Sequence, residues 1–450
     1  EAWSIRHKAF TPSLVSSYTK AKNVTTDLIA YLQKQSETGE TINILDVFTL
    51  YAFDIICKII FQYDLNAING SEEGKKLLLS LDTLATAQAS TGYFPLKGVR
   101  KVSSDELTSA KLNWKQFLNK LISVITSDAE QFKSKHGALT PQTVFGHALI
   151  TMKETNQEFT DEHIKSEIHQ VLRHGYECIA GQLVWVFVAL HRNHKIRKQL
   201  ESELETYTTT SSSTSHPSSS LSPSLHSSSS LPYLEAVLKE TLRRYPITGN
   251  ATVRTVMEVD QNTGKALLLN KYPVPIGTLL HLHIWSMHNT TYIWDKPKDF
   301  EPDRWLEKPR VETVINQEDE EECEAEISRA PTEACHVSMK ESEEGYTQYD
   351  GVGHIEGELS YFPFSTGARI CPGRILSISI MRATVLDICS KFRLNPVTTH
   401  WEADPGNSAS STVLPADKRN IMLKVIQKGR DEEEEKEQDD GWAQDSDDEK

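Results

Sequence analysis

The sequence predicts a mainly α-helical fold with small β-sheets. Residues 46–65 and 111–132 carry apolar side chains three and four positions apart, which is the spacing of an amphipathic helix. Short segments of strand-like composition lie between residues 247 and 290, and another covers 420–426. This order of elements indicates one helical domain with minor sheets.

The longest predicted helical stretch covers residues 160–204. Thr160 is suited to cap its start, and the two acids that follow suit a first helical turn. Residues 175–190 are apolar nearly all round, which predicts a fully buried helix. We expect the stretch to divide into two helices near His191–His194.

Shorter elements follow. Residues 233–245 predict a helix that ends at Pro246, and residues 374–392 predict another. Strands are expected within 252–259, 266–270 and 278–285. Two segments interrupt this order, a Ser-rich loop at 208–230 and an acidic, polar insertion at 307–358. An acidic tail at 429–450 is expected to be disordered.

The net charge of −15 is concentrated in two segments. Residues 318–358 carry 14 acids against 2 bases, and residues 430–450 carry 12 acids against 3 bases. The rest of the chain has a net charge of +6. A basic body with acidic segments favours an acidic protein partner over nucleic acid, and no interleaving of aromatic and basic residues indicates a nucleic-acid surface.

The chain opens with EAWSIRHKAF, without Met and inside a predicted helix, so we expect the natural N-terminus to lie further upstream. The sequence contains no signal-peptide pattern. It also contains no apolar run of the ~18 residues that a transmembrane helix needs.

One of the six cysteines has an unusual context. Cys371 lies in FSTGARICPG, directly before a predicted helix, where backbone N–H groups and the helix dipole stabilise a thiolate. The glycines permit close approach by a flat group, and Arg369 supplies a cation for an anionic ligand. These features indicate a thiolate that binds haem iron.

The motif F-x-x-G-x-R-x-C-x-G, formed here by Phe364, Gly367, Arg369, Cys371 and Gly373, resembles the haem-binding signature of the cytochrome P450 family. The resemblance implies a haem b (iron protoporphyrin IX) whose axial ligand is Cys371. It also implies the cytochrome P450 fold, without the N-terminal membrane anchor and the first helices.

Other segments resemble the same family in the same order. KETLRRYP supplies Glu240 and Arg243 of an E-x-x-R pair, and WDKPKDFEPDRWL supplies Arg304. In the family these three side chains form a buried ion network on the thiolate side. Glu and Arg three residues apart are common by chance and usually form a surface helix pair. The assignment of Glu240 and Arg243 therefore depends on the surrounding sequence, which also resembles the family.

Three residues are implied to contact the haem propionates. Trp3 matches its position in the family's helix, whereas His7 occupies a position that is usually Arg. Arg254, in ATVRTV, matches the family's other propionate arginine. A solvated strand arginine is the alternative interpretation of Arg254.

The segment HGYECIAGQ at 174–182 departs from the family pattern. Glu177 matches the family's acid, but Cys178 replaces the alcohol that helps the acid deliver protons to reduced dioxygen. A thiol is a weak hydrogen-bond donor, so we expect poor coupling, with reduced oxygen released as peroxide or water.

His174 occupies a position that is small in the family. It shares a helix face with Cys178, so it could bind iron opposite Cys371. Steric crowding without ligation, or a side chain turned aside, are the alternatives.

The resemblance implies a single haem-thiolate domain over residues 1–428. The expected activity is a monooxygenase that inserts one O₂-derived atom into an apolar, possibly lipid-like, substrate, with electrons from NADPH through a reductase on the basic thiolate-side face. A location at the endoplasmic reticulum membrane, or in a plastid, is implied. The alternatives are a haem-thiolate isomerase or dehydratase that needs no O₂ activation, and an inactive haem-binding protein.

Overall fold

The computed structural model describes residues 14, 24–91, 101–137, 139, 145–156, 158–213, 231–249, 252–256, 268–269, 272–306, 361–365, 370–397 and 421–428. The chain divides into two compact units. The first unit contains Glu1–Thr241 and Pro372–Lys450, and the second contains Leu242–Cys371. The described residues are mainly helical with small sheets, which confirms the predicted fold class. The single domain over 1–428 stays a prediction.

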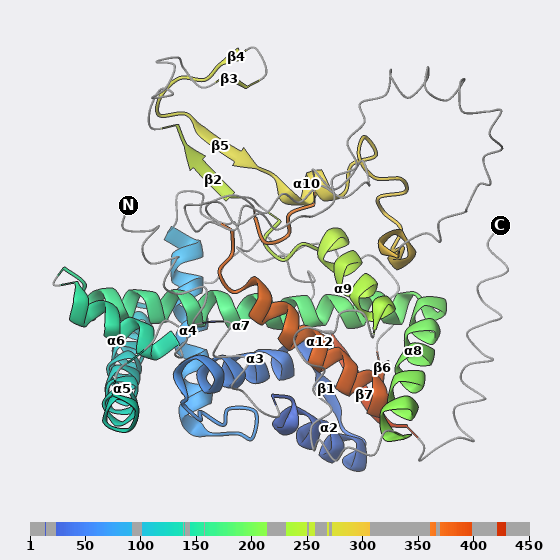
Figure 1. The fold of residues 1–450 in the computed structure, drawn as a ribbon, viewed down its shortest axis with the longest axis horizontal. Helices are drawn as coiled ribbons and strands as arrows, with labels where there is room; N and C mark the ends of the chain where they lie inside the picture. The colour runs from blue at the N-terminus through green and yellow to red at the C-terminus, as the bar shows by residue number, and fades with distance from the viewer. Residues whose placement is uncertain are drawn as a thin grey trace. The chain divides into compact units, whose positions relative to one another are not determined.

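Helix α7 (Asp161–Arg192) lies near the centre of the first unit's helices (Figure 1). Helix α3 (Ile44–Phe61) packs along it. The Phe48 and Phe187 rings lie 5.6 Å apart, and the Phe53 and Tyr176 rings meet edge to face at 5.4 Å. These contacts bury the apolar faces that the sequence pattern predicted for both helices.

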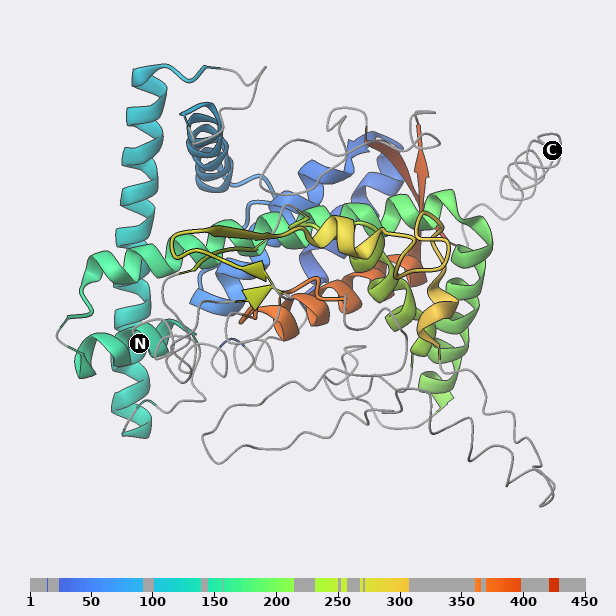
Figure 2. The same cartoon turned by 90° about the horizontal axis from the view of Figure 1, so that it is seen from above.

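The first unit contains further helices. They are α2 (Thr26–Thr38), α4 (Glu72–Thr91), α5 (Ser104–His136), α6 (Phe145–Thr155), α8 (His194–Ser213) and α12 (Arg374–Lys391), together with most of α9 (Pro232–Arg244). Helix α5 crosses α7 steeply (Figure 2). Its start is fixed by a capping box between Ser103 and Glu106.

One three-stranded antiparallel sheet belongs to the first unit. Its order is β1 (Thr41–Asn43), β7 (Met422–Gln427) and β6 (Phe392–Pro396). Strand β7 confirms the strand predicted at 420–426. Strand β6 begins at the residue after the end of α12, so the helix and the sheet are connected without a loop.

Helix α7 begins and ends where the sequence predicts. Thr160 is its N-cap residue, and α8 begins at His194 after a break at Asn193. Every residue from Ile179 to Leu190 is buried. The prediction that residues 175–190 are fully buried is therefore wrong for residues 175–178, which retain partial exposure.

The Ser-rich loop expected from residue 208 begins later than predicted. Helix α8 continues to Ser213, and threonine hydroxyls near its end bond to carbonyls of the preceding turn. The hydroxyls of Thr208 and Thr209 donate to the Glu205 carbonyl at 2.9 and 3.0 Å. The rest of that loop, the acidic insertion and the tail lie outside the described residues.

The second unit contains two small antiparallel sheets. Strand β2 (Thr252–Thr255) pairs with β5 (Leu279–Leu282), and β3 (Leu268–Leu269) pairs with β4 (Tyr272–Pro273). The strand expected over 278–285 is shorter than predicted, since helix α10 (Ile284–His288) begins within it. The His283 ring caps α10 by accepting a hydrogen bond from the Ser286 N–H at 3.3 Å. A short 3₁₀ helix, η2 (Pro302–Trp305), follows.

Within the described part of the chain, no helix combines the length and apolarity needed to cross a lipid bilayer.

Candidate functional site

The segment before Cys371 forms a closed loop. The backbone N–H of Cys371 donates a hydrogen bond to the Phe364 carbonyl at 2.9 Å, and the Ser365 N–H donates to the Phe362 carbonyl at 2.9 Å. Ser365 has a φ of 64°, a left-handed conformation that favours glycine. The chain therefore turns at Ser365, and a backbone hydrogen bond joins Cys371 to Phe364.

The Cys371 thiol differs from the other described thiols. Cys371 is exposed, whereas Cys57 and Cys389 are buried and Cys178 is partly buried. Burial raises the pKa of Cys57 and raises that of Cys389 to about 12, so both are held as neutral thiols. Gly373, two residues after Cys371, is the N-cap of α12. Of these cysteines, Cys371 is the most accessible, and its role as the metal ligand stays a prediction.

Residue His288 fixes the start of this loop. Its side chain is fully buried, and its Nε2 accepts a hydrogen bond from the Phe362 N–H at 3.1 Å. Its ring stacks on Tyr361 with centroids 5.4 Å apart. The pKa of His288 is lowered to about 4, mainly by burial and secondly by the Arg243 guanidinium. The Leu242 and Arg243 carbonyls raise this pKa, but by less. The imidazole is therefore neutral at pH 7.

Glu240 and Arg243 lie on α9, and neither exposes any surface. Arg243 donates to the carbonyls of His288 at 2.8 Å, Pro297 at 3.0 Å and Asp299 at 3.0 Å. Its guanidinium also lies 5.3 Å from the centroid of the Trp294 ring. Arg243 thus holds the end of α10 and the following turns together.

Arg304 lies on η2, and its side chain is 12% exposed. It pairs with Glu301 at 3.1 Å and donates to the Asp295 carbonyl at 3.3 Å. Arg243 and Arg304 therefore bind the same short segment, residues 295–301. The three-residue network that includes Glu240 stays a prediction.

Arg254 lies on β2 and is exposed. Its Nη1 donates to the Val253 carbonyl at 3.0 Å. Because the side chain is exposed and a guanidinium has five N–H donors, Arg254 is accessible for a further anionic contact. Four other predicted site residues lie outside the described residues, namely Trp3, His7, Gly367 and Arg369.

The predicted oxygen-side residues lie on α7. Glu177 and Cys178 are partly buried, and the His174 side chain is exposed. Desolvation, first, and Arg173, second, nevertheless lower the pKa of His174, while Glu177 raises it. His174 is therefore neutral at pH 7, the form that binds metals. Gly175 packs on Ile56, whose Cδ1 would lie 3.2 Å from an added Cβ.

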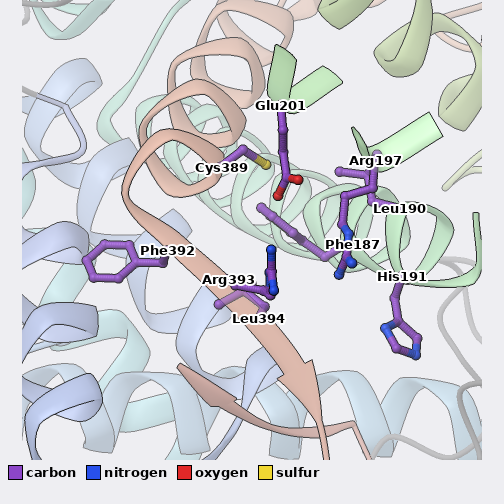
Figure 3. A pocket seen from close by; sticks show the side chains of 9 residues that line it. All are labelled: Phe187, Leu190, His191, Arg197, Glu201, Cys389, Phe392, Arg393 and Leu394. Atoms are coloured by element: carbon purple, nitrogen blue, oxygen red, sulfur yellow. The ribbon is translucent and has the colours of Figure 1, made fainter. Parts of the chain in front are cut away.

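A small cavity lies in the first unit, and none of the predicted site residues lines it (Figure 3). Its volume is about 30 Å³, the share of one water molecule, so it cannot hold an organic substrate. It is lined by Phe187, Leu190, His191, Arg197, Glu201, Cys389, Phe392, Arg393 and Leu394. In the described part of the chain, no group of three or more His, Cys, Asp or Glu side chains could hold a metal ion.

The family model described as cytochrome P450 matches residues 1–322 and 347–423, which is most of the chain. The chain belongs to the cytochrome P450 family. The match includes Cys371, its loop, α9 and α7.

Curated cytochrome P450 relatives are distant. The chain is 23% identical to cytochrome P450 3A12 of Canis lupus familiaris over 374 residues, covering 82% of this chain and 62% of that protein. It is 22% identical to 5-OH-xanthotoxin synthase of Ammi majus over 388 residues, covering 83% of this chain and 63% of that protein. The chain thus spans less than two thirds of the length of these two relatives.

The fold is that of cytochrome P450 haem domains. The crystal structure of the cytochrome P450DA heme domain superposes with a TM-score of 0.62 at 17% identity, covering 94% of this chain and 75% of that chain. A variant of the same heme domain gives a TM-score of 0.63.

The cytochrome P450 fold implies a haem cofactor, and the described residues fit one. Cys371 offers an exposed thiol at the end of a hydrogen-bonded loop, and Arg254 offers an exposed guanidinium for a carboxylate. His288 and Tyr361 support that loop but were not predicted. Their contact joins residues more than seventy positions apart, and no local pattern in a single sequence signals such a pairing.

Proposed function

We propose that this protein is a haem-thiolate monooxygenase that inserts one oxygen atom from O₂ into an apolar, possibly lipid-like, small molecule. The observation that carries the proposal is the setting of Cys371. This residue is exposed, and its backbone N–H donates a hydrogen bond to the Phe364 carbonyl. The family supports haem-thiolate oxidation in general. The substrate, its site of oxidation and the electron source belong to the proposal.

The residues around Cys371 would hold the cofactor. Cys371 would supply its thiolate to the iron, and Phe364, Gly367 and Gly373 are the motif residues that surround it in the sequence. Arg369 stands two residues from the thiolate and supplies a cation for the anionic ligand. When bound, haem b would supply the redox-active iron for an oxidation that uses O₂.

The propionates of the haem would be held by Trp3, His7 and Arg254. An indole N–H and a guanidinium both donate hydrogen bonds to carboxylates, and a guanidinium adds its charge. The exposure of the Arg254 side chain on β2 supports this role. Glu240, Arg243 and Arg304 would hold the thiolate side of the domain without touching the haem.

Proton delivery would depend on Glu177 and Cys178. The Glu177 carboxylate can accept and pass on protons, but the adjacent thiol is a weak partner for water. We therefore expect part of the reduced oxygen to leave as peroxide or water. The exposed His174 side chain would bind the haem iron, would narrow the space beside it, or would turn aside.

Cys178 also favours a second candidate. A haem-thiolate isomerase or dehydratase acts on a substrate that already contains its oxygen, so it needs neither the alcohol nor a reductase. An inactive haem-binding protein is the third candidate, supported by the same substitution.

The proposal includes a partner and a location. A reductase that carries electrons from NADPH would dock on the basic thiolate-side face, because the chain without its two acidic segments has a net charge of +6. We place the protein at a membrane, that of the endoplasmic reticulum or of a plastid, through a segment outside this sequence. A single domain over residues 1–428, interrupted by the two insertions, completes the proposal.

The first test is the absorption spectrum of the haem-loaded protein, oxidised, then reduced, then reduced with CO. A red-shifted thiolate–CO band is expected in the wild type and in Cys389→Ala, and it should be absent in Cys371→Ala. Persistence of the band in Cys371→Ala would refute the ligand assignment. A low-spin spectrum that changes in His174→Ala would show that His174 binds the iron.

Turnover then separates the candidates. Consumption of substrate that requires O₂ and reductase identifies a monooxygenase. Turnover of a peroxide under anaerobic conditions without reductase identifies an isomerase or dehydratase.

A further inference from the structure

The imidazole of His288 joins two separate stretches of the second unit. It accepts the Phe362 N–H at 3.1 Å, across 74 positions of sequence. The ring also stacks on Tyr361 at 5.4 Å and meets the Phe362 ring edge to face at 6.1 Å. The side chain is fully buried, so water cannot replace it as the acceptor.

The backbone of α10 is held just as firmly on its other side. The His288 carbonyl accepts from Arg243 Nη1 at 2.8 Å, and the Met287 carbonyl accepts from Trp294 Nε1 at 3.0 Å. The Trp294 ring packs on Trp305 at 5.7 Å, and Trp305 packs on Tyr361 at 4.6 Å. The frame that carries the imidazole therefore has little freedom to move.

A continuous series of hydrogen bonds leads from this frame to the thiol-bearing residue. His288 Nε2 accepts from Phe362 N–H, the Phe362 carbonyl accepts from Ser365 N–H, and the Phe364 carbonyl accepts from Cys371 N–H. The last two distances are both 2.9 Å. Apart from the Nε2 acceptor of His288, every group in this part of the series is a backbone group.

We infer that His288 is a positioning residue for Cys371, and that its Nε2 acceptor fixes the loop that directs the thiolate toward the haem iron. The inference rests on the proposed function of Cys371 as axial ligand. A side chain without an acceptor would leave the half-buried Phe362 N–H without its partner. The loop would then open at its first hydrogen bond and present the thiolate in more than one orientation.

The test compares His288→Gln with His288→Met. Gln and Met have nearly the same length and volume, but Gln offers an amide oxygen near the position of Nε2, and Met offers only a weakly accepting sulfur. The first readout is amide hydrogen exchange of residues 361–371 in the haem-free protein. The second is the fraction of bound haem that gives the thiolate–CO band.

The expected result is about tenfold faster exchange of the Phe362 amide in His288→Met, with His288→Gln close to wild type. The thiolate–CO fraction per bound haem should fall in His288→Met and recover in His288→Gln. A residue that only stabilises the fold would lower the yield of protein but not this fraction.

Two results would overturn the inference. One is wild-type exchange and wild-type spectra in both variants, and the other is equal impairment of both, which would show that the acceptor is irrelevant. If His288→Met does not fold, amide exchange in the wild type tests the inference instead. Its Phe362 amide must then exchange as slowly as the Cys371 amide, and an unprotected Phe362 amide refutes the inference.

Failure of the proposed function would look different. A wild type without the thiolate–CO band would refute Cys371 as ligand, yet the exchange difference between the Gln and Met variants would still be measurable. The variant Cys371→Ala serves as the matched control, because it removes the band while leaving the Phe362 hydrogen bond in place.

Discussion

Arg243 Nη1 lies 2.8 Å from the carbonyl oxygen of His288, and both side chains are fully buried. The same guanidinium donates to the carbonyls of Pro297 and Asp299. One planar cation thus satisfies three backbone acceptors from two different turns. An ammonium group cannot match this arrangement, because its donors diverge from a single point.

We predict that Arg243→Lys lowers the free energy of unfolding by about 3 kcal/mol or more, since two buried carbonyls lose a charged donor. Chemical denaturation of the purified protein measures the change. Arg244→Lys is the matched control, because Arg244 donates to the Lys298 carbonyl at an exposed position. The control should cost less than about 1 kcal/mol. Equal effects in the two variants would contradict the prediction.

The low pKa of His288 predicts a loss of stability in mild acid. The folded-state pKa is about 4, below the ordinary value of 6.5, so the unfolded chain binds a proton in this range and the folded chain does not. The stability is therefore fully present above pH 6.5 and falls as the pH is lowered toward 4. Between pH 7 and pH 5 we expect this group to remove about 2 kcal/mol.

The comparison of wild type with His288→Gln isolates this effect. His191, whose pKa is also lowered to about 4 by burial and by Arg197, is present in both proteins and cancels. The unfolding free energy of His288→Gln should depend less on pH between 7 and 5. A pH dependence identical to that of the wild type would show that His288 does not titrate as described.

Gln182 is a buried polar side chain in the apolar half of α7. It is 2% exposed, and neither its amide oxygen nor its amide nitrogen has a hydrogen-bond partner among the described residues. We predict that Gln182→Met raises the free energy of unfolding by about 1–2 kcal/mol, because Met fills the same space without buried unpaired groups.

Thermal or chemical unfolding tests this prediction. Gln170→Met, at an exposed position of the same helix, is the control and should change stability by less than about 0.5 kcal/mol. A lower free energy of unfolding in Gln182→Met would contradict the prediction, because it would show that the Gln182 amide makes a stabilising hydrogen bond.

Most of the helices could be predicted because their cause is local. Spacing of apolar residues, Thr160 as a cap and the break before His194 are all encoded within a few positions. The end of α8 was missed, because Thr- and Ser-rich composition predicts a loop, whereas Thr208 and Thr209 continue the helix with their hydroxyls bonded to its own carbonyls. The shortened strand before α10 was missed for a similar reason, since the His283 cap depends on side-chain geometry.

The candidate site divides in the same way. Cys371 and Arg243 could be singled out because fixed motifs surround them, and their roles at the haem stay predictions. His288, Tyr361 and Trp294 were not, because they meet through tertiary packing between segments that the acidic insertion separates. Arg304 was predicted within a network, and the structure pairs it with Glu301, three residues away, a partner that the network did not include.

The last prediction concerns Cys178, the residue that departs most from the family pattern. Cys178→Thr restores an alcohol beside Glu177, and Cys178→Val has nearly the same shape without the hydroxyl. If proton delivery limits coupling, peroxide released per NADPH oxidised should fall severalfold in the Thr variant and not in the Val variant. A coupled reductase assay with peroxide detection measures the ratio. Equal peroxide release in both variants would mean that the thiol does not limit proton delivery, and a reductase-free isomerase would then gain support.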